Sequence, residues 1–291
     1  MSEGVASLAH MATPLAIRPA ARPPSPAAPT PPRPPSAPRP PSLAVALELL
    51  RSCDAPSAEL AALTAAGVRV ELAWVGSAQP EWMIRLAWLL GVDRRALIRL
   101  MADALAEAAA ALPESAPLAL TRVIEALPRW VVGEVATSEL LGGLDDLAIL
   151  ADAETDPRHP APLTLLCWAA SLTLWAADVA EHTDLLRWKL THRSEKMAAR
   201  GSPTLPELMR EGAGHAAAAL RFVADAHAHA SLALQPPVAP LSSPSQRSVP
   251  WSPRARAASQ AAEALRRTLP AGSLLRRLSA ARFTPSANWI D

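Results

Sequence analysis

The chain has 291 residues, half of them hydrophobic, which is enough apolar material for a sizeable core. Ala and Leu dominate that apolar set, whereas Tyr is absent and only two Phe occur, so helix formers far outnumber strand formers. The net charge of +1 is unevenly distributed, and the lack of a glycine-rich phosphate loop or a Gly-x-Ser-x-Gly elbow gives no support to nucleotide-dependent enzymes or serine hydrolases.

Residues 1–42 form a Pro-rich arm with four Arg and one Glu, a net charge of +3. Repeated Pro-x-x-Pro spacing predicts a disordered segment of polyproline II character. The arm does not have the basic and then apolar order of a secretory leader. The two cysteines, Cys53 and Cys167, form no spaced motif, so we expect a cytoplasmic protein.

Residues 43–235 form the predicted body, which carries −8 once the charges of the two flanks are removed. Periodicity and end signals predict about eight helices, and hence an irregular all-α bundle with disordered Pro-rich flanks. The expected helices are 43–51, 58–66, 80–90, 93–111, 117–133, 137–153, 162–200 and 206–233, with a possible bend at 182–184 in the seventh. Residues 68–75 alternate like a strand but have no partner, so we expect a loop or an irregular helix there.

Three features inside the body carry specific expectations. Pro128 should kink or break its helix, and Thr137 or Ser138 should cap the next one. The longest uncharged run, residues 163–177, is shorter than the about 20 residues of a membrane-spanning helix. We therefore expect a buried helix at the centre of the bundle. Its stripe, spaced three and four apart, contains Leu165, Trp168, Leu172, Trp175 and Val179.

Residues 236–291 form a Pro-rich linker and a basic tail of net charge +6, with helical patterns near 255–269 and 273–283. The second of these predicts a short basic amphipathic helix, which could dock on the acidic body or a partner, or attach to a membrane surface. Within it, Arg276, Arg277 and Ser279 also match the pattern that basophilic kinases read, where a phosphate would lower the local positive charge.

Acidic residues cluster around the end of the helix predicted at 137–153. They are Asp145, Asp146, Asp152, Glu154 and Asp156. Neighbouring positions do not share a helical face, so Asp145 and Asp146 do not suit acid–base catalysis. The cluster predicts a surface that receives a basic protein partner, and an acidic body does not predict nucleic-acid binding.

A metal site is the alternative that the histidines offer. Asp178 and His182 are one turn apart on the central helix, and His215 lies on the last helix of the body, so a helical bundle could bring the three together. The set matches no known metal motif, and no catalytic constellation is recognisable. We therefore expect no cofactor and no enzymatic activity, with a metal-dependent enzyme as the alternative.

One motif resembles a known family. Arg122, Ile124, Glu125, Ala126, Trp130, Gly133 and Glu134, followed by Thr137, fit the pattern Arg-x-Ile-Glu-Ala-x-x-x-Trp-x-x-Gly-Glu and a Thr-capped helix. This is similar to the Ala-rich, all-helical immunity-protein-like family of bacterial toxin systems, over about residues 80–235. The resemblance implies neutralisation of a toxin by protein–protein binding, without catalytic residues. Pro128 interrupts the motif helix, which is a departure from the family pattern.

Overall fold

A computed structural model describes residues 42–65, 69–153, 161–191, 203–233 and 252–281. The chain separates into two compact units, Met1–Arg39 and Pro40–Asp291, and every described residue belongs to the second. The Pro-rich arm of residues 1–41 and the linker of residues 234–251 therefore lie outside the described residues, and the predictions of disorder there stay predictions.

The second unit is all-α, as predicted, and its described residues contain no strand. Its helices are α1 (Ser42–Ser52), α2 (Ser57–Ala65), α3 (Val70–Gly76), α4 (Pro80–Leu89), α5 (Arg94–Ala110), α6 (Leu118–Val131), α7 (Thr137–Leu141), α8 (Leu144–Asp152), α9 (Pro162–Thr191), α10 (Leu205–Ala233), α11 (Pro253–Thr268) and α12 (Ala271–Ala281). The predicted count of about eight is wrong, because residues 70–76 are helical and Gly142–Gly143 divides one expected helix into α7 and α8. The tail adds α11 and α12.

Local signals set several helix ends. Pro80 opens α4 in its first turn, and the Asp93 side chain caps α5 by accepting a hydrogen bond from the backbone N–H of Arg95. Gly91 lies between these helices with φ +65°, a conformation that an L side chain rarely adopts. Pro128 does not break α6, which continues to Val131.

Thr137 is the first residue of α7 and not its cap, because Ala136 occupies the N-cap position without a side-chain bond. Its buried hydroxyl instead accepts a hydrogen bond from Trp130 Nε1 at 2.7 Å and donates to Glu181 of α9. The hydroxyl thus ties α6 and α7 to α9, and a tertiary contact has replaced the predicted local one.

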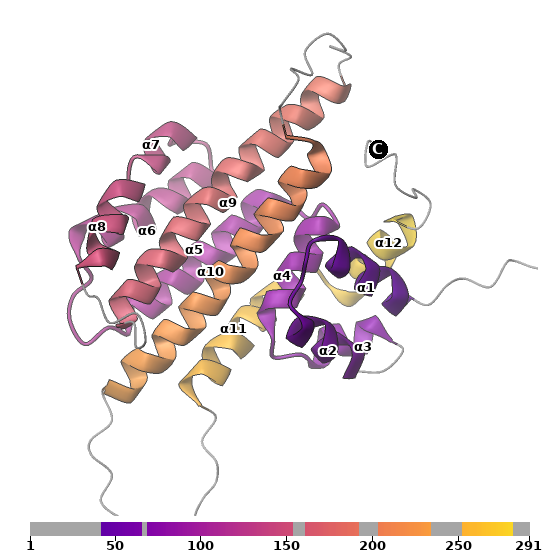
Figure 1. Ribbon diagram of the computed structural model, residues 1–291, viewed down its shortest axis with the longest axis horizontal. Helices are drawn as coiled ribbons and strands as arrows, with labels where there is room; N and C mark the ends of the chain where they lie inside the picture. The colour runs from indigo at the N-terminus through magenta and orange to yellow at the C-terminus, as the bar shows by residue number, and fades with distance from the viewer. Residues whose placement is uncertain (1–41, 66–68, 154–160, 192–202, 234–251, 282–291) are drawn as a thin grey trace, which may run out of the picture. The chain divides into compact units, whose positions relative to one another are not determined.

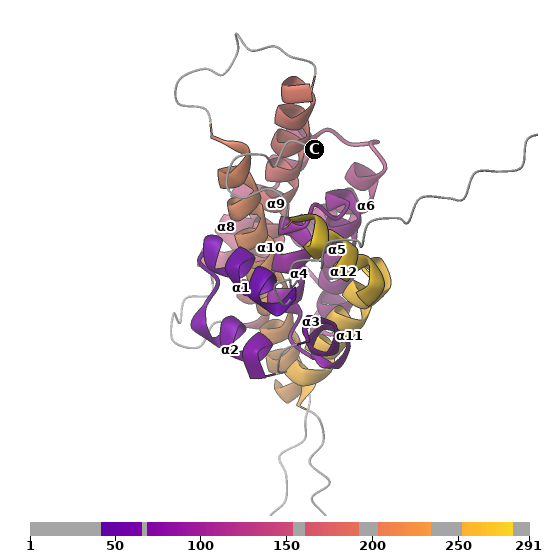
Figure 2. The same cartoon turned by 90° about the vertical axis from the view of Figure 1, so that its right-hand side faces the viewer.

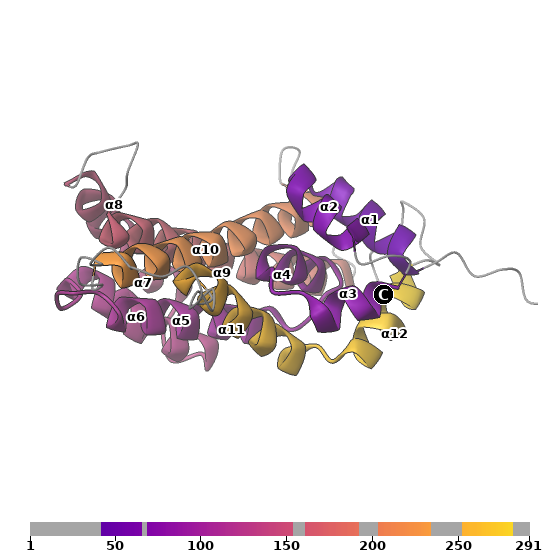
Figure 3. The ribbon, with the colours of Figure 1, turned by 90° about the horizontal axis from the view of Figure 1, so that it is seen from below.

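Helix α9 contacts five other helices, α5, α6, α7, α8 and α10, and its most extensive contact is with α10. Figure 1 shows α8, α9 and α10 side by side, and Figure 3 shows α5, α6 and α11 on the other side of this layer. α9 continues through residues 182–184 without a break. Its Pro162–Trp188 stretch is long and apolar enough to cross a membrane by length and composition, and 67% of its apolar 18-residue window is buried in the fold.

The predicted orientation of α9 is wrong. Trp168 and Trp175 are 38% and 44% exposed, while small side chains such as Cys167, Ala170 and Ala177 face the core and are fully buried. Small residues let the axis of α10 approach closely, and they leave no room for an indole. Leu165 and Val179, at the two ends of the predicted stripe, are buried, so only its middle part reaches solvent. Cys53 and Cys167 are both buried and form no disulfide.

Helices α11 and α12, expected in a separate tail, pack into the same unit as the body (Figure 2). Leu265, Leu274 and Leu278 are fully buried there. The Nη1 atom of Arg277 donates to the carbonyl oxygens of Leu90 and Gly91 at the end of α4. Arg266 likewise donates to Trp74 and Ser77 at the end of α3, and Trp74 Nε1 donates to the carbonyl of Leu269.

Candidate functional site

An aromatic stripe runs along the outer side of α9. Trp168, Leu172 and Trp175 are spaced four and three apart, so they share one side of the helix. Leu172 is half-buried between the two exposed indoles. Most large apolar side chains of this unit are buried, so two adjacent exposed tryptophans on its central helix need an explanation.

Phe222 of α10 extends this stripe. Its ring meets Trp168 edge to face, with centroids 5.5 Å apart and an angle of 61° between the planes. The guanidinium of Arg221 lies 5.2 Å from the Phe222 centroid, in cation–π range. We call Trp168, Leu172, Trp175 and Phe222 the aromatic face. Trp168 is fixed by this packing, whereas Trp175 makes no ring contact with another residue that the structure describes.

The predicted acidic cluster falls partly on α8, which packs along α9. Asp145, Asp146 and Asp152 are exposed and form no ion pair within the described part of the chain; Glu154 and Asp156 lie outside it. Asp145 and Asp146 occupy the first turn of α8, where the helix dipole stabilises negative charge. Asp145, Ile149 and Asp152 share the outer side of α8, and Ile149 is 68% exposed.

The predicted metal ligands form two separate pairs. His182 Nδ1 lies 3.3 Å from Asp178 Oδ1 on α9, whereas His215 Nε2 lies 3.5 Å from Glu211 Oε1 on α10. No group of three His, Cys, Asp or Glu side chains that could hold a metal ion occurs in the residues the structure describes. The structure therefore does not assemble the Asp178–His182–His215 set into one site.

The predicted tail residues have three different environments. Arg276 is exposed and donates to the hydroxyl of Ser273 at 2.8 Å, and Ser279 is also exposed. Arg277 instead contacts the carbonyl end of α4 through the bonds described above. The tail thus docks on the body at helix ends, where carbonyl groups carry partial negative charge. Among the described residues, no tail arginine forms an ion pair with the acidic residues of α8.

Arg94, at the start of α5, is a buried charge that the sequence did not reveal. It is 4% exposed and forms an ion pair with Asp184 of α9, with Nη1 and Oδ1 3.1 Å apart. Its Nε and Nη2 atoms have no hydrogen-bond partner among the described residues, and Trp88 lies 5.9 Å away in cation–π geometry. Burial lowers the pKa of Arg94, and the nearby charge of Arg187 lowers it further. The pair joins α5 to α9, with the Arg94 side chain buried and the Asp184 side chain 56% exposed.

Comparison with known proteins returned no match to a family model, a curated protein or a solved structure.

Proposed function

We propose that this chain is a non-enzymatic protein-binding helical domain whose aromatic face holds a basic partner. The observation that carries the proposal is the exposure of Trp168 and Trp175 on α9, a helix that packs against five others. Tryptophan is strongly enriched among residues that dominate binding energy, because one side chain covers a large apolar area at low entropic cost. The partner would bury these indoles at the centre of its interface.

Charge supports a basic partner. Residues 43–235 carry −8, and the α8 carboxylates Asp145, Asp146 and Asp152 have no cation from the described residues beside them. Unpaired carboxylates on α8, which packs along α9, would steer a cationic partner toward this part of the unit and penalise an anionic one.

The motif around Trp130 suggests a more specific form of this proposal, an immunity-like role in which the domain masks a basic toxin. The structure gives the motif a structural use, since Trp130 is buried and donates to Thr137. The other functions considered receive less support. The apolar side of the basic tail helix is covered through Leu274 and Leu278, so it is not presented to a membrane. The histidines considered for a metal enzyme lie in two separate pairs.

The proposal is tested with a synthetic amphipathic helix of Lys and Leu as the probe. Trp175→Ser should weaken binding of this peptide by about tenfold or more, because a hot-spot tryptophan contributes that much or more. Fluorescence anisotropy of the labelled peptide gives the affinity, and circular dichroism shows that the variant is folded.

Trp188→Ser is the matched control, since Trp188 is 58% exposed on the same helix but off the stripe. It should leave the affinity unchanged. Raising the salt concentration should weaken binding to the unmodified chain, and the same helix with Glu in place of Lys should not bind. Equal losses for both Trp variants, or an affinity that does not depend on salt, would overturn the proposal.

A further inference from the structure

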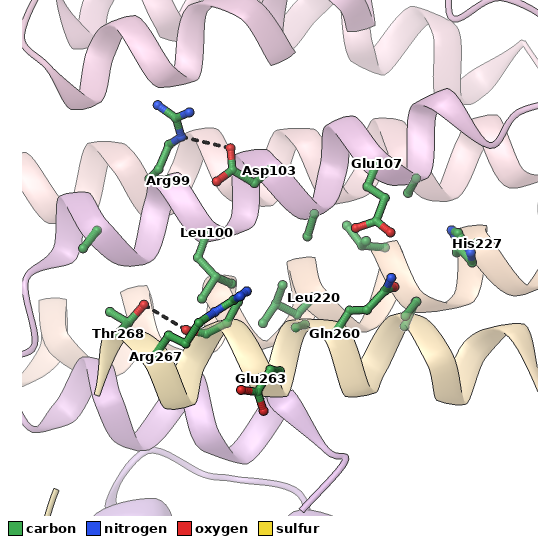
Figure 4. A pocket seen from close by; sticks show the side chains of 18 residues that line it. Arg99, Leu100, Asp103, Glu107, Leu220, His227, Gln260, Glu263, Arg267 and Thr268 are labelled. Carbon is green, nitrogen blue, oxygen red and sulfur yellow. Dashed lines mark hydrogen bonds and ion pairs between the residues drawn. The ribbon is translucent and has the colours of Figure 1, made fainter. Parts of the chain in front are cut away.

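A groove of about 780 Å³ lies between α5, α10 and α11, lined by residues of all three helices (Figure 4). Its volume is in the range of clefts that bind small molecules. The groove exists because alanine supplies seven of its lining residues, so the helix walls present little side-chain bulk. None of the residues of the aromatic face lines it.

The floor of the groove is apolar, and several of the charged side chains that line it form ion pairs with oppositely charged neighbours. Leu220 and Ala224 of α10 are 1% and 2% exposed. Arg99 Nε pairs with Asp103 Oδ1 at 2.9 Å on α5, and Glu263 pairs with Arg266 on α11. These pairs leave little net charge for a ligand to meet along the middle of the groove.

Two opposite charges remain at the ends. Glu107 and Arg267 form no ion pair or side-chain hydrogen bond with another described residue. Figure 4 shows Glu107 near the end that holds His227 and Gln260, whereas Arg267 lies at the other end beside Thr268. A ligand along the groove would therefore meet a carboxylate at one end and a guanidinium at the other.

The separation of the ends sets the ligand length. Arg99 lies at the Arg267 end, and Glu107 is eight residues further along α5, which is about 12 Å along a helix axis. An extended peptide covers this distance with three or four residues, at about 3.3–3.6 Å each. The amide of Gln260 offers both a donor and an acceptor to a peptide group.

We propose that this groove binds a short, linear, apolar peptide as a zwitterion, with its amino group at Glu107 and its carboxylate at Arg267. The small side chains of the ligand lie over the alanine-lined floor. The charged ends fix its direction, because reversal would bring like charges together at both ends. This site is separate from the aromatic face, so the proposal does not depend on the proposed function.

The probe is tetra-alanine, in four forms: uncapped, N-acetylated, C-amidated and capped at both ends. Binding is followed by ¹H–¹⁵N NMR titration of the full chain. The uncapped peptide should perturb the resonances of Gln260 and Leu220 with a Kd of about 1 mM or below. Each cap should weaken binding about fivefold, as expected for the loss of one partly exposed ion pair.

Two variants assign the ends. With Glu107→Gln, N-acetylation should have no further effect while amidation still weakens binding; with Arg267→Gln the reverse should hold. Arg276→Gln, outside the groove, should behave like the unmodified chain. The proposal is overturned if uncapped tetra-alanine causes no chemical-shift change at a concentration 10 times the expected Kd of about 1 mM, or if the resonances that shift belong to residues outside the groove. It is also overturned if the two caps weaken binding by the same factor in every variant. Binding of the Lys-Leu helix stays unchanged in every variant, so the two proposals fail separately.

Discussion

At the scale of single residues, Gly212 of α10 has the tightest surroundings of the described glycines. A Cβ built at this glycine would lie 2.4 Å from Cζ2 of Trp88, and Trp88 is fully buried. The indole cannot move away without displacing the core around it. Gly212→Ala should therefore destabilise the protein by about 2–3 kcal/mol, since overpacking outweighs the gain in helix propensity. Urea unfolding followed by circular dichroism measures the loss.

Gly214 provides the matched control, two residues along the same helix. There a new Cβ would meet only Arg85 Nη1 at 3.8 Å, an ordinary van der Waals contact. Gly214→Ala should stabilise the protein by about 0.5–1 kcal/mol, because alanine loses less backbone entropy in a helix. If both substitutions shift the unfolding midpoint in the same direction, the tight Trp88–Gly212 contact does not exist in solution.

At the scale of elements, arginines of the C-terminal helices bind the open carbonyl ends of α3 and α4. Arg277 of α12 donates to two carbonyl groups that the end of a helix leaves unpaired. Arg277→Ala should cost about 1 kcal/mol, a value reduced for the partial exposure of the side chain. Arg276→Ala, next to it and exposed, should stay within about 0.5 kcal/mol of the unmodified chain. Equal unfolding midpoints of the two variants in urea would refute this role of Arg277.

The same scale shows what the sequence can predict. The helix starts at Pro80 in α4 and at the Asp93 cap of α5, each of which depends on one residue, were predicted correctly by the ranges 80–90 and 93–111. Thr137 was not, because its hydroxyl found a tertiary partner in Glu181. A capping residue near a helix start is a local signal, but the sequence does not show which distant group competes for the same hydroxyl.

The face of α9 was beyond prediction for a related reason. Periodicity indicates which residues share a side, and Trp168 and Trp175 do share one. It does not indicate which side is buried when a helix is apolar all round, as α9 is with Cys167, Ala170 and Ala177 opposite the indoles. The choice depends on how closely α10 can approach. The candidate site became visible only when the structure showed the tryptophans to be exposed.

At the scale of the whole molecule, the positive charges of the tail and the negative charges of the body differ in their structural roles. Residues 236–291 carry +6, yet two of their arginines, Arg266 and Arg277, donate to carbonyl groups of the body. Arg254 pairs with Asp225 of α10 at 2.9 Å. Basic residues of the tail are thus used in holding the unit together, while the α8 carboxylates have no such cation among the described residues. This division is what leaves an acidic surface for a partner.

The C-terminal helices should therefore be required for folding. A chain that ends at residue 251 loses Leu265, Leu274 and Leu278, each fully buried. Three buried leucines contribute about 5–9 kcal/mol, which is comparable with the 5–15 kcal/mol total stability of a typical domain. The truncation also removes the carbonyl of Leu269, the acceptor of the buried Trp74 indole. We expect the shortened chain to show no cooperative thermal transition and to expose apolar surface to a hydrophobic dye.

Point substitutions distinguish the effect of losing buried leucines from the effect of losing the positive charge of the tail. Leu278→Ala should destabilise the full chain by about 2–5 kcal/mol, whereas Ser279→Ala, its exposed neighbour, should have almost no effect. If the chain ending at residue 251 melts with the same midpoint as the full chain, α11 and α12 are an independent appendage. Absence of a cooperative transition in the truncated chain, together with a single transition at a lower midpoint for Leu278→Ala at the same protein concentration, means that body and tail fold as one unit.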